Sequence, residues 1–94
     1  MAVARGESLA MTTGAFVYLL RCGDDSLYCG WTTDVQRRLE AHQAGTASRY
    51  TRSRPPVELA WSKQVESRAA AMREEARIKR LSRSEKLRLS AENE

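Results

Sequence analysis

Residues 15–31, with the sequence AFVYLLRCGDDSLYCGW, predict a β-hairpin. Ala15–Arg21 and Leu27–Trp31 are apolar and contain the aromatic and branched residues that favour strands. Between them, Cys22–Ser26 supplies glycine, aspartate and serine, which favour tight turns. We therefore expect two paired strands at the start of the folded domain.

Two tyrosines, Tyr18 and Tyr28, lie on this hairpin. Side chains alternate between the two faces of a sheet, so Tyr18 shares a face with Phe16 and Leu20. If the turn is centred near Asp24, Tyr28 can come close to Tyr18 on that face. Tyrosine is a favoured strand residue, and such pairs are more often half-buried packing residues than catalytic ones. The residues around them must decide which role applies.

A helix is predicted over residues 34–44. Thr33 is a good N-cap, and Gln36, three residues later, completes a capping box. Gly45 is a suitable C-terminal stop, because glycine readily adopts the left-handed backbone that ends many helices. The hairpin is therefore followed directly by a helix of about three turns.

Arg38 and His42 stand four residues apart on this helix and share one of its faces. That face borders the apolar stripe formed by Val35 and Leu39. An arginine beside such a stripe often extends its charged head into water, and a histidine at a helix end is more often structural than catalytic. Next to two tyrosines, however, an arginine and a histidine form a set suited to handling phosphate.

A third strand is predicted at Val57–Ser62, after a loop over residues 46–56. Alternation places Val57, Leu59 and Trp61 on one buried face of this strand.

Two more helices are expected after this strand. Ser67 can cap a helix that ends near Leu81, and the capping box Ser82-Arg-Ser-Glu85 begins another from Arg83 to about Ser90. The order β-β-α-β-α-α predicts an α+β fold, in which helices flank a small three-stranded, mainly antiparallel sheet.

A carboxylate on the first of these helices, Glu75, is the most specific candidate for a functional residue. Glu75 lies within about 60° of Ala71, Met72 and Ile78 around the helix, and a carboxylate in an apolar stripe is costly unless it is paired or binds a metal. Glu74 is a rival that helical periodicity cannot exclude. Both can also be surface charges paired with neighbouring basic residues.

The net charge is +4, and 13 of the 16 basic residues are arginines, which suit bidentate contact with phosphate. The loop at residues 46–56 contains no acidic residue. Within it, Tyr50 could stack on a base, while three arginines could contact backbone phosphates. We therefore expect a nucleic-acid-binding set that also includes the nearby lysine: Arg49, Tyr50, Arg52, Arg54 and Lys63.

One domain is expected over residues 15–90, between a flexible arm at 1–14 and a tail at 91–94. A chain of 94 residues buries only about 60–65% of its unfolded surface, so no separate cofactor domain fits. Cys22 and Cys29 lack zinc-site spacing and are too few for a disulfide scaffold, so we expect reduced cysteines in a cytoplasmic protein. No run approaches the ~18–20 apolar residues of a membrane helix, so no membrane contact is expected.

In their order along the chain, these residues resemble the GIY-YIG nuclease family, and most closely its small stand-alone bacterial members. The two motifs that name the family match Val17-Tyr18-Leu19 and Tyr28-Cys29-Gly30. The resemblance extends from Phe16 to about Leu89 and continues through later motifs: Thr32-Thr33-Asp34, Arg37-Arg38-Leu39, His42, Tyr50-Thr51-Arg52, Pro56-Val57 and Glu75 to Arg83.

The resemblance implies hydrolysis of phosphodiester bonds in DNA with one divalent metal ion, Mg²⁺ or Mn²⁺. Tyr18 and Tyr28 would position and deprotonate the attacking water, directly or through a relay. Arg38 would stabilise charge on the phosphate, and His42 would assist proton transfer or positioning. Glu75 would hold the metal, because alignment on the following Ile-Lys pair selects it as the family's carboxylate.

The chain departs from the family pattern in two places. The first motif lacks its glycine and isoleucine, and Cys29 replaces isoleucine in the second. These changes fall on packing positions and keep both tyrosines. In addition, Ser84–Leu89 contains no asparagine, whereas some family members carry one near the site. The missing asparagine bears on activity rather than on the fold.

Three functions are compatible with the sequence. The first is an endonuclease that acts on DNA, in repair or recombination. The second is a non-catalytic nucleic-acid-binding module, which would bind with strong salt dependence and cleave nothing. The third is a nuclease subunit that acts only with a protein partner. RNA stays open as a substrate, and the sequence does not indicate an oligomeric state.

Overall fold

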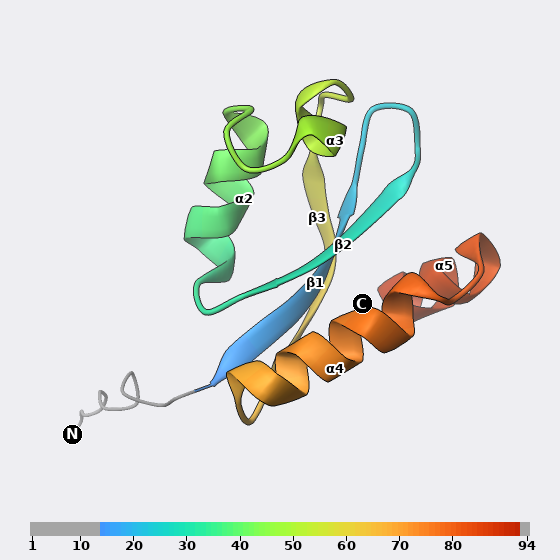
Figure 1. Ribbon diagram of the computed structural model, residues 1–94. Coiled ribbons are helices and arrows are strands. Elements are labelled where there is room, and N and C mark those ends of the chain that lie inside the picture. Colours follow the sequence, from blue (N-terminus) through green and yellow to red (C-terminus); the bar gives the residue numbers. More distant parts are fainter. Residues whose placement is uncertain (1–13, 93–94) are drawn as a thin grey trace.

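The computed structural model describes residues 14–92, and these form a three-stranded sheet with helices on both faces (Figure 1). The predicted α+β fold is confirmed. Within the described residues the elements are, in chain order, β1 (Ala15–Arg21), β2 (Leu27–Thr32), α2 (Val35–Gln43), α3 (Arg49–Arg52), β3 (Glu58–Val65), α4 (Arg68–Lys79) and α5 (Arg83–Glu92).

The sheet has the order β2-β1-β3, and both pairings are antiparallel. The predicted hairpin joins β1 to β2, with Tyr18 opposite Gly30 and Leu20 opposite Tyr28. Paired residues project to the same face of a sheet, so Tyr18 and Tyr28 both lie on the face that α2 covers. Alternation thus placed both tyrosines correctly.

Two apolar clusters hold the helices to the sheet. On the face that α4 covers, Val17 and Leu19 pack with Ala71 and Ile78, and all four side chains are fully buried. On the other face, Tyr18, Leu20 and Val57 are buried, with Tyr28 and Leu39 packed against them. The sheet therefore lies between two helical layers, and each layer contributes residues to the candidate site.

The third strand differs from the prediction in its extent and in one face. β3 continues to Val65, and its register with β1 shifts between Leu19, which faces Trp61, and Leu20, which faces Leu59. Ala60 is the extra residue of this β-bulge, and a bulge interrupts alternation along a strand. As a result Trp61 is 5% exposed but Leu59 is 39% exposed, so the predicted common buried face was wrong.

The cap of the first helix was also misassigned. Asp34, and not Thr33, is the N-cap of α2, and its carboxylate accepts a hydrogen bond from the Arg37 amide at 3.1 Å. Asp34 is held there by its own amide, which donates to the hydroxyl of Thr32 at 3.1 Å. Both Thr33 and Asp34 are common caps, so the sequence alone could not place the helix start to within one residue.

The segment predicted as a loop contains the single-turn helix α3. Ser48 caps it, because its hydroxyl accepts from the Tyr50 amide at 3.0 Å. The buried residue of this turn is Thr51. A serine cap before a four-residue turn leaves almost no periodic signal, which is why the sequence did not predict the helix.

Helix α4 carries Glu75, and the predicted cap at Ser67 is confirmed: its hydroxyl accepts from the Ala70 amide at 3.0 Å. We expect Ser67→Ala to lower the free energy of unfolding by about 1 kcal/mol, because it leaves an N-terminal amide without its partner. That loss corresponds to roughly 4–8 °C in Tm for a domain of this size. Thermal unfolding followed by circular dichroism measures the shift, and Ser67→Asp, which keeps a capping acceptor, should show little of it.

Helix α5 begins with the predicted capping box, in which Ser82 and Glu85 exchange two hydrogen bonds of 2.8 and 3.2 Å. The helix continues to Glu92, so the first two residues of the expected tail are helical. The rest of that tail and, except for Gly14, the expected arm lie outside the described residues. Cys22 and Cys29 are both free cysteines, and the structure shows that both are buried. No helix in residues 14–92 is long and apolar enough to cross a membrane.

Candidate active site

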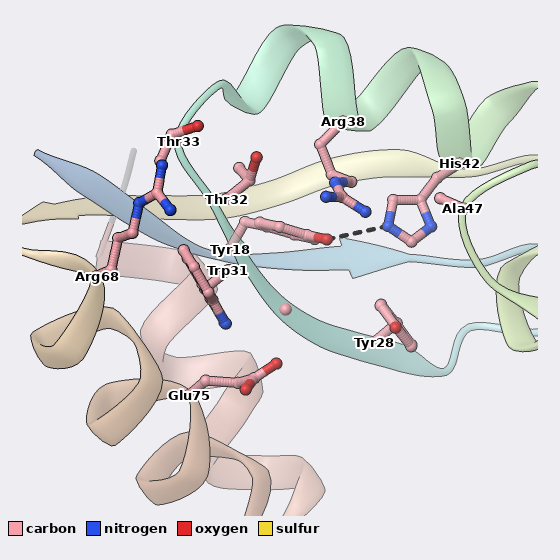
Figure 2. A pocket seen from close by; sticks show the side chains of 11 residues that line it. Tyr18, Tyr28, Trp31, Thr32, Thr33, Arg38, His42, Ala47, Arg68 and Glu75 are labelled. Atoms are coloured by element: carbon pink, nitrogen blue, oxygen red, sulfur yellow. Dashed lines mark hydrogen bonds between the residues drawn. The ribbon is translucent and has the colours of Figure 1, made fainter.

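All five residues predicted to form the catalytic site line a single open pocket of about 390 Å³. Figure 2 shows them converging from three parts of the fold: tyrosines from the hairpin, Arg38 and His42 from α2, and Glu75 from α4. The pocket lies where the edge strand β2 passes between the two helical layers. Its remaining lining residues are Gly30, Trp31, Thr32, Thr33, Ala47 and Arg68.

A chain of buried hydrogen bonds crosses the floor of the pocket. The hydroxyl of Tyr18 lies 3.0 Å from Nε2 of His42, and Nδ1 of the same ring lies 2.8 Å from Oγ1 of Thr51. Tyr18, His42 and Thr51 are 3%, 2% and 1% exposed, so water does not compete for these contacts. The histidine is therefore held at both nitrogens, in contrast to an ordinary helix-end histidine on the surface.

Burial sets the protonation of this pair. It raises the pKa of Tyr18 above its ordinary value of 10.0, with a further rise from Tyr28 and a smaller opposing effect of Arg38. Burial also lowers the pKa of His42 below 6.5, and the Arg38 cation lowers it further. Near neutral pH Tyr18 is therefore a phenol and His42 a neutral imidazole, whose unprotonated ring nitrogen can accept a hydrogen bond from the phenol.

The ring of Tyr28 packs edge-on against His42, with ring centroids 5.2 Å apart. The ring of Tyr28 also contacts the ring of Tyr50 of α3, at a centroid distance of 5.6 Å. Such aromatic contacts contribute about 0.5–1.5 kcal/mol each beyond the burial of area. Together they hold Tyr28 against the wall of the pocket and beside the Tyr18–His42 pair.

The structure separates the two rival glutamates. Glu75 lines the pocket with the tyrosines, and its one ion pair within residues 14–92 is a loose one with Lys79 at 3.4 Å. Glu74 points to a different groove, where it forms a close pair with Arg77 at 2.7 Å and a longer one with Lys63 at 3.9 Å. The two carboxylates are equally accessible, at 22% and 21% exposure, so they differ in their surroundings and not in burial.

A divalent metal ion fits the donor chemistry of Glu75. No cluster of three or more His, Cys, Asp or Glu side chains that could cage a metal occurs in residues 14–92. Mg²⁺ does not require such a cage, because it commonly keeps several waters and binds through one or two carboxylates together with substrate phosphate. A lone accessible carboxylate in a polar pocket suits this mode of binding.

Gly30 is required for the approach of Tyr18 to the pocket. A Cβ atom at position 30 would lie 2.5 Å from the Tyr18 hydroxyl and 2.7 Å from its ring carbon Cζ, closer than such atoms can pack. We expect Gly30→Ala to displace this hydroxyl from His42 and to lower cleavage by at least about tenfold, since one misplaced catalytic group costs that or more.

Two measurements check this expectation. Single-turnover cleavage measures the loss of rate, and thermal unfolding separates it from loss of fold. Gly23→Ala is an unsuitable control, because a Cβ atom at position 23 would collide with backbone atoms. Gly45→Asn is the control instead, because Gly45 lies outside the pocket and asparagine tolerates its left-handed backbone. A wild-type rate for Gly30→Ala would contradict the need for this close approach.

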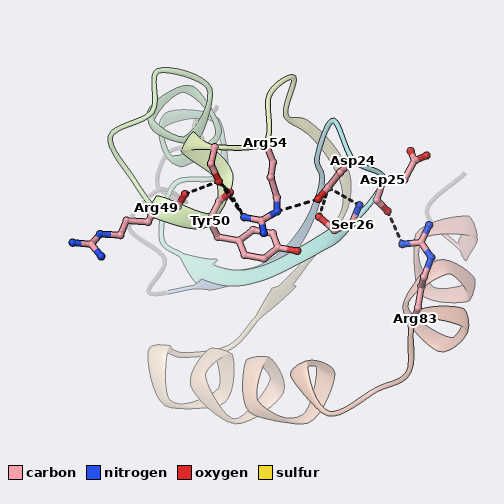
Figure 3. A network of polar contacts seen from close by, with 8 residues as sticks. Asp24, Asp25, Ser26, Arg49, Tyr50, Arg54 and Arg83 are labelled. Atoms are coloured by element: carbon pink, nitrogen blue, oxygen red, sulfur yellow. Dashed lines mark hydrogen bonds and ion pairs between the residues drawn. The ribbon is translucent and has the colours of Figure 1, made fainter.

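The arginine-rich segment is less free than its sequence suggests. Figure 3 shows that Arg54 pairs with Asp24 of the β1–β2 turn at 3.0 Å, so the expectation that no acid offsets this segment was wrong. The same guanidinium lies 3.8 Å above the ring of Tyr50 and covers one side of it. Arg49 and Arg52 are exposed and remain available for phosphate contact.

Lys63 does not lie near this segment. It pairs across the sheet with Val17, which projects to the α4 face, and its ammonium lies near Glu74. The predicted nucleic-acid-binding residues therefore occupy two separate regions. In contrast, sequence reasoning missed Thr51 and Arg68, which the structure brings to the site or its rim. The sequence did not indicate either residue, because Thr51 lay in the predicted loop and Arg68 is one of several arginines on the predicted helix.

The family model for the GIY-YIG catalytic domain matches residues 14–88, which is most of the chain. The chain belongs to the GIY-YIG family. The residues that carry this match include the hairpin, α2 and α4, so the family assignment and the pocket rest on the same elements.

Relatives of this GIY-YIG domain are themselves small proteins. A UPF0213 protein of Natronomonas pharaonis is 48% identical, over 87% of this chain and 96% of its own. One from Streptococcus sanguinis is 51% identical, over 82% and 88%. The solution structure of a UPF0213 protein from Bacillus halodurans is 42% identical in sequence, with a TM-score of 0.53 over 83% of both chains. A solution structure of a protein from E. faecalis is 38% identical, with a TM-score of 0.55 over 80% of both chains.

Proposed function

We propose that this GIY-YIG domain is a divalent-metal-dependent endonuclease that hydrolyses phosphodiester bonds in DNA. The observation that carries the proposal is the convergence of a tyrosine–histidine pair, the Arg38 guanidinium and an accessible carboxylate in one pocket. Family membership supports nuclease chemistry. We further propose a role in repair or recombination, with a protein partner for targeting. The preferred substrate in a panel of DNA structures that includes an RNA duplex tests the first of these.

Proton transfer falls to Tyr18 and His42. The attacking water gives its proton to the oxygen of Tyr18 as the phenolic proton of Tyr18 passes to Nε2 of His42, 3.0 Å away. The relay leaves hydroxide to attack phosphorus, a phenol on Tyr18 and an imidazolium on His42. Because burial raises the pKa of Tyr18, its hydroxyl is protonated near neutral pH, so it can take a proton from water only as it gives its own proton to an acceptor such as this histidine.

The other pocket residues position and stabilise the phosphate. Arg38 lies at the mouth of the pocket and can donate two parallel hydrogen bonds to phosphate oxygens as negative charge develops on them. Tyr28 orients the water beside the relay. Glu75 would hold Mg²⁺ or Mn²⁺, which when bound would polarise the phosphate and stabilise the leaving oxygen.

The reaction type has a direct test in water enriched in heavy oxygen. Hydrolysis by water predicts that one heavy oxygen enters the phosphate of the cleaved strand and that no protein remains attached to DNA. The alternative chemistry open to a site with two tyrosines is attack by a phenolic oxygen on phosphorus. That route predicts a covalent protein–DNA adduct that survives denaturation, and its detection would overturn hydrolysis by an activated water.

A further inference from the structure

Nδ1 of His42, the ring nitrogen that does not contact Tyr18, is held by a residue outside the predicted catalytic set. Thr51 contributes a fully buried hydroxyl from the single turn of α3, and this hydroxyl lies 2.8 Å from Nδ1 of the histidine. Within residues 14–92, the one other hydrogen bond of this oxygen is to the carbonyl of Ser48, at 3.4 Å. The contacts of His42 and Thr51 indicate which atom donates in each hydrogen bond that connects Tyr18, His42, Thr51 and Ser48.

A count of protons gives that direction. A buried phenol needs an acceptor, and within the described residues the only hydrogen bond of the Tyr18 hydroxyl is with Nε2 of His42. A neutral imidazole that accepts at Nε2 carries its proton on Nδ1 and donates it to the oxygen of Thr51. Thr51 then directs its own proton to the carbonyl of Ser48, three residues back in the same turn.

We propose that Thr51 is a positioning residue that holds His42 in the tautomer with its proton on Nδ1, so that Nε2 is free to accept the proton of Tyr18. The proposal rests on the proposed function for its catalytic consequence, but the tautomer itself is a property of the folded protein. The charged and titratable groups that face this histidine are Tyr18 from β1, Tyr28 from β2 and Arg38 from its own helix. None of them contacts Nδ1, so Thr51 decides the tautomer.

The opposite tautomer would disable the relay. With its proton on Nε2, the histidine would donate to Tyr18 and could not take the phenolic proton. Groups that hold the non-ligating nitrogen of a metal-binding histidine typically contribute about 10- to 100-fold in metal affinity or activity, and we expect an effect of similar size from Thr51. The role therefore differs from packing, which would affect stability without changing which nitrogen carries the proton.

The test uses the chain's single histidine. Nitrogen NMR of uniformly labelled protein above the pKa of His42 reports directly which ring nitrogen is protonated. The wild-type protein should show the proton on Nδ1, and Thr51→Ser, which keeps the hydroxyl, should show the same. Thr51→Val has the same shape without the hydroxyl and should lose this preference. A wild-type histidine protonated on Nε2, or an unchanged tautomer in Thr51→Val, would overturn the proposal.

Cleavage supplies the second readout. We expect Thr51→Val to lower the single-turnover rate by roughly 10- to 100-fold with DNA affinity unchanged, and Thr51→Ser to restore most of it. Equal rates for wild type and Thr51→Val would contradict a positioning role. If the wild-type protein cleaves no substrate, the proposed nuclease function fails while the NMR result still decides the tautomer. The two failures are thus distinguishable.

Discussion

Replacing Glu75 by glutamine should abolish most metal-dependent cleavage, with an expected fall of about 1,000-fold. A metal contributes several kcal/mol to such a reaction, and each 1.4 kcal/mol corresponds to a factor of ten in rate. Glutamine keeps the size and helix propensity of the side chain and removes its charge. Only a loose ion pair with Lys79 is lost from the fold, and exposed pairs of this kind contribute at most about 1 kcal/mol.

Glu74→Gln is a matched control for this substitution. Glu74 is the adjacent residue on α4 and has nearly the same exposure, 21% against 22%, but it lines another groove. Its loss removes the closer ion pair with Arg77, so it tests whether disturbing the charges of α4 is enough to affect activity. We expect cleavage by this variant to stay near the wild-type rate. Equal losses in both variants, or full activity of Glu75→Gln, would contradict the metal-binding role of Glu75.

Replacing Arg38 by alanine should lower the rate of the chemical step by about 100- to 1,000-fold, the usual effect of removing one preorganised donor to a developing oxyanion. The loss should appear in kcat rather than KM, because the guanidinium acts on charge that develops in the transition state. Arg38→Lys keeps the charge but cannot donate two parallel hydrogen bonds, so it should recover only part of the rate.

Arg37→Ala is the natural comparison, since Arg37 is the neighbouring exposed arginine of α2 but does not line the candidate active site. It should weaken DNA binding slightly, with little effect on kcat, because a single surface cation contributes mainly through counterion release. Single-turnover rates at saturating enzyme, measured beside equilibrium binding, separate the two effects. A similar fall in kcat for both variants would mean that general basic charge, and not the position of Arg38, supports cleavage.

The hairpin shows what the sequence could predict. Strand composition, turn residues and simple alternation were enough to place Tyr18 and Tyr28 on one face, because these are local properties of the backbone. The N-cap of α4 and the capping box of α5 were predictable for the same reason, since Ser67 and Ser82 act on residues within a single turn. The predicted cap of α2 was displaced by one residue, from Thr33 to Asp34.

Features that depend on distant partners could not be predicted. The bulge at Ala60 arises from the pairing of β3 with β1, so nothing in the strand itself predicted the exposure of Leu59. Helical periodicity left Glu74 and Glu75 equivalent, and only the packing of α4 beside β2 separates them. Likewise, Arg54 meets its acidic partner, Asp24, across 30 positions of the chain.

In the candidate site too, local features were predictable from the sequence, whereas features that depend on distant residues were not. Arg38 and His42 were placed on one helix face by their spacing, but the burial of the histidine depends on contacts with β1 and α3. Burial lowers its pKa, so the ring is neutral near pH 7, and the contact with β1 places its Nε2 against the Tyr18 hydroxyl. The chemistry of this histidine is therefore a property of the tertiary fold, and the helix alone does not determine it.

The most direct measurement of the central claim is cleavage of a nucleic-acid panel by the wild-type protein, with Mg²⁺ and with EDTA. The panel contains duplex, single-stranded, flap and four-way-junction DNA, together with an RNA duplex. The account predicts that at least one DNA substrate is cut in Mg²⁺ and none in EDTA, and the preferred structure would indicate repair or recombination. Binding to every substrate without cutting, in Mg²⁺ and in Mn²⁺, would contradict cleavage by the protein alone and would indicate a nucleic-acid-binding module or a nuclease subunit that acts only with a partner.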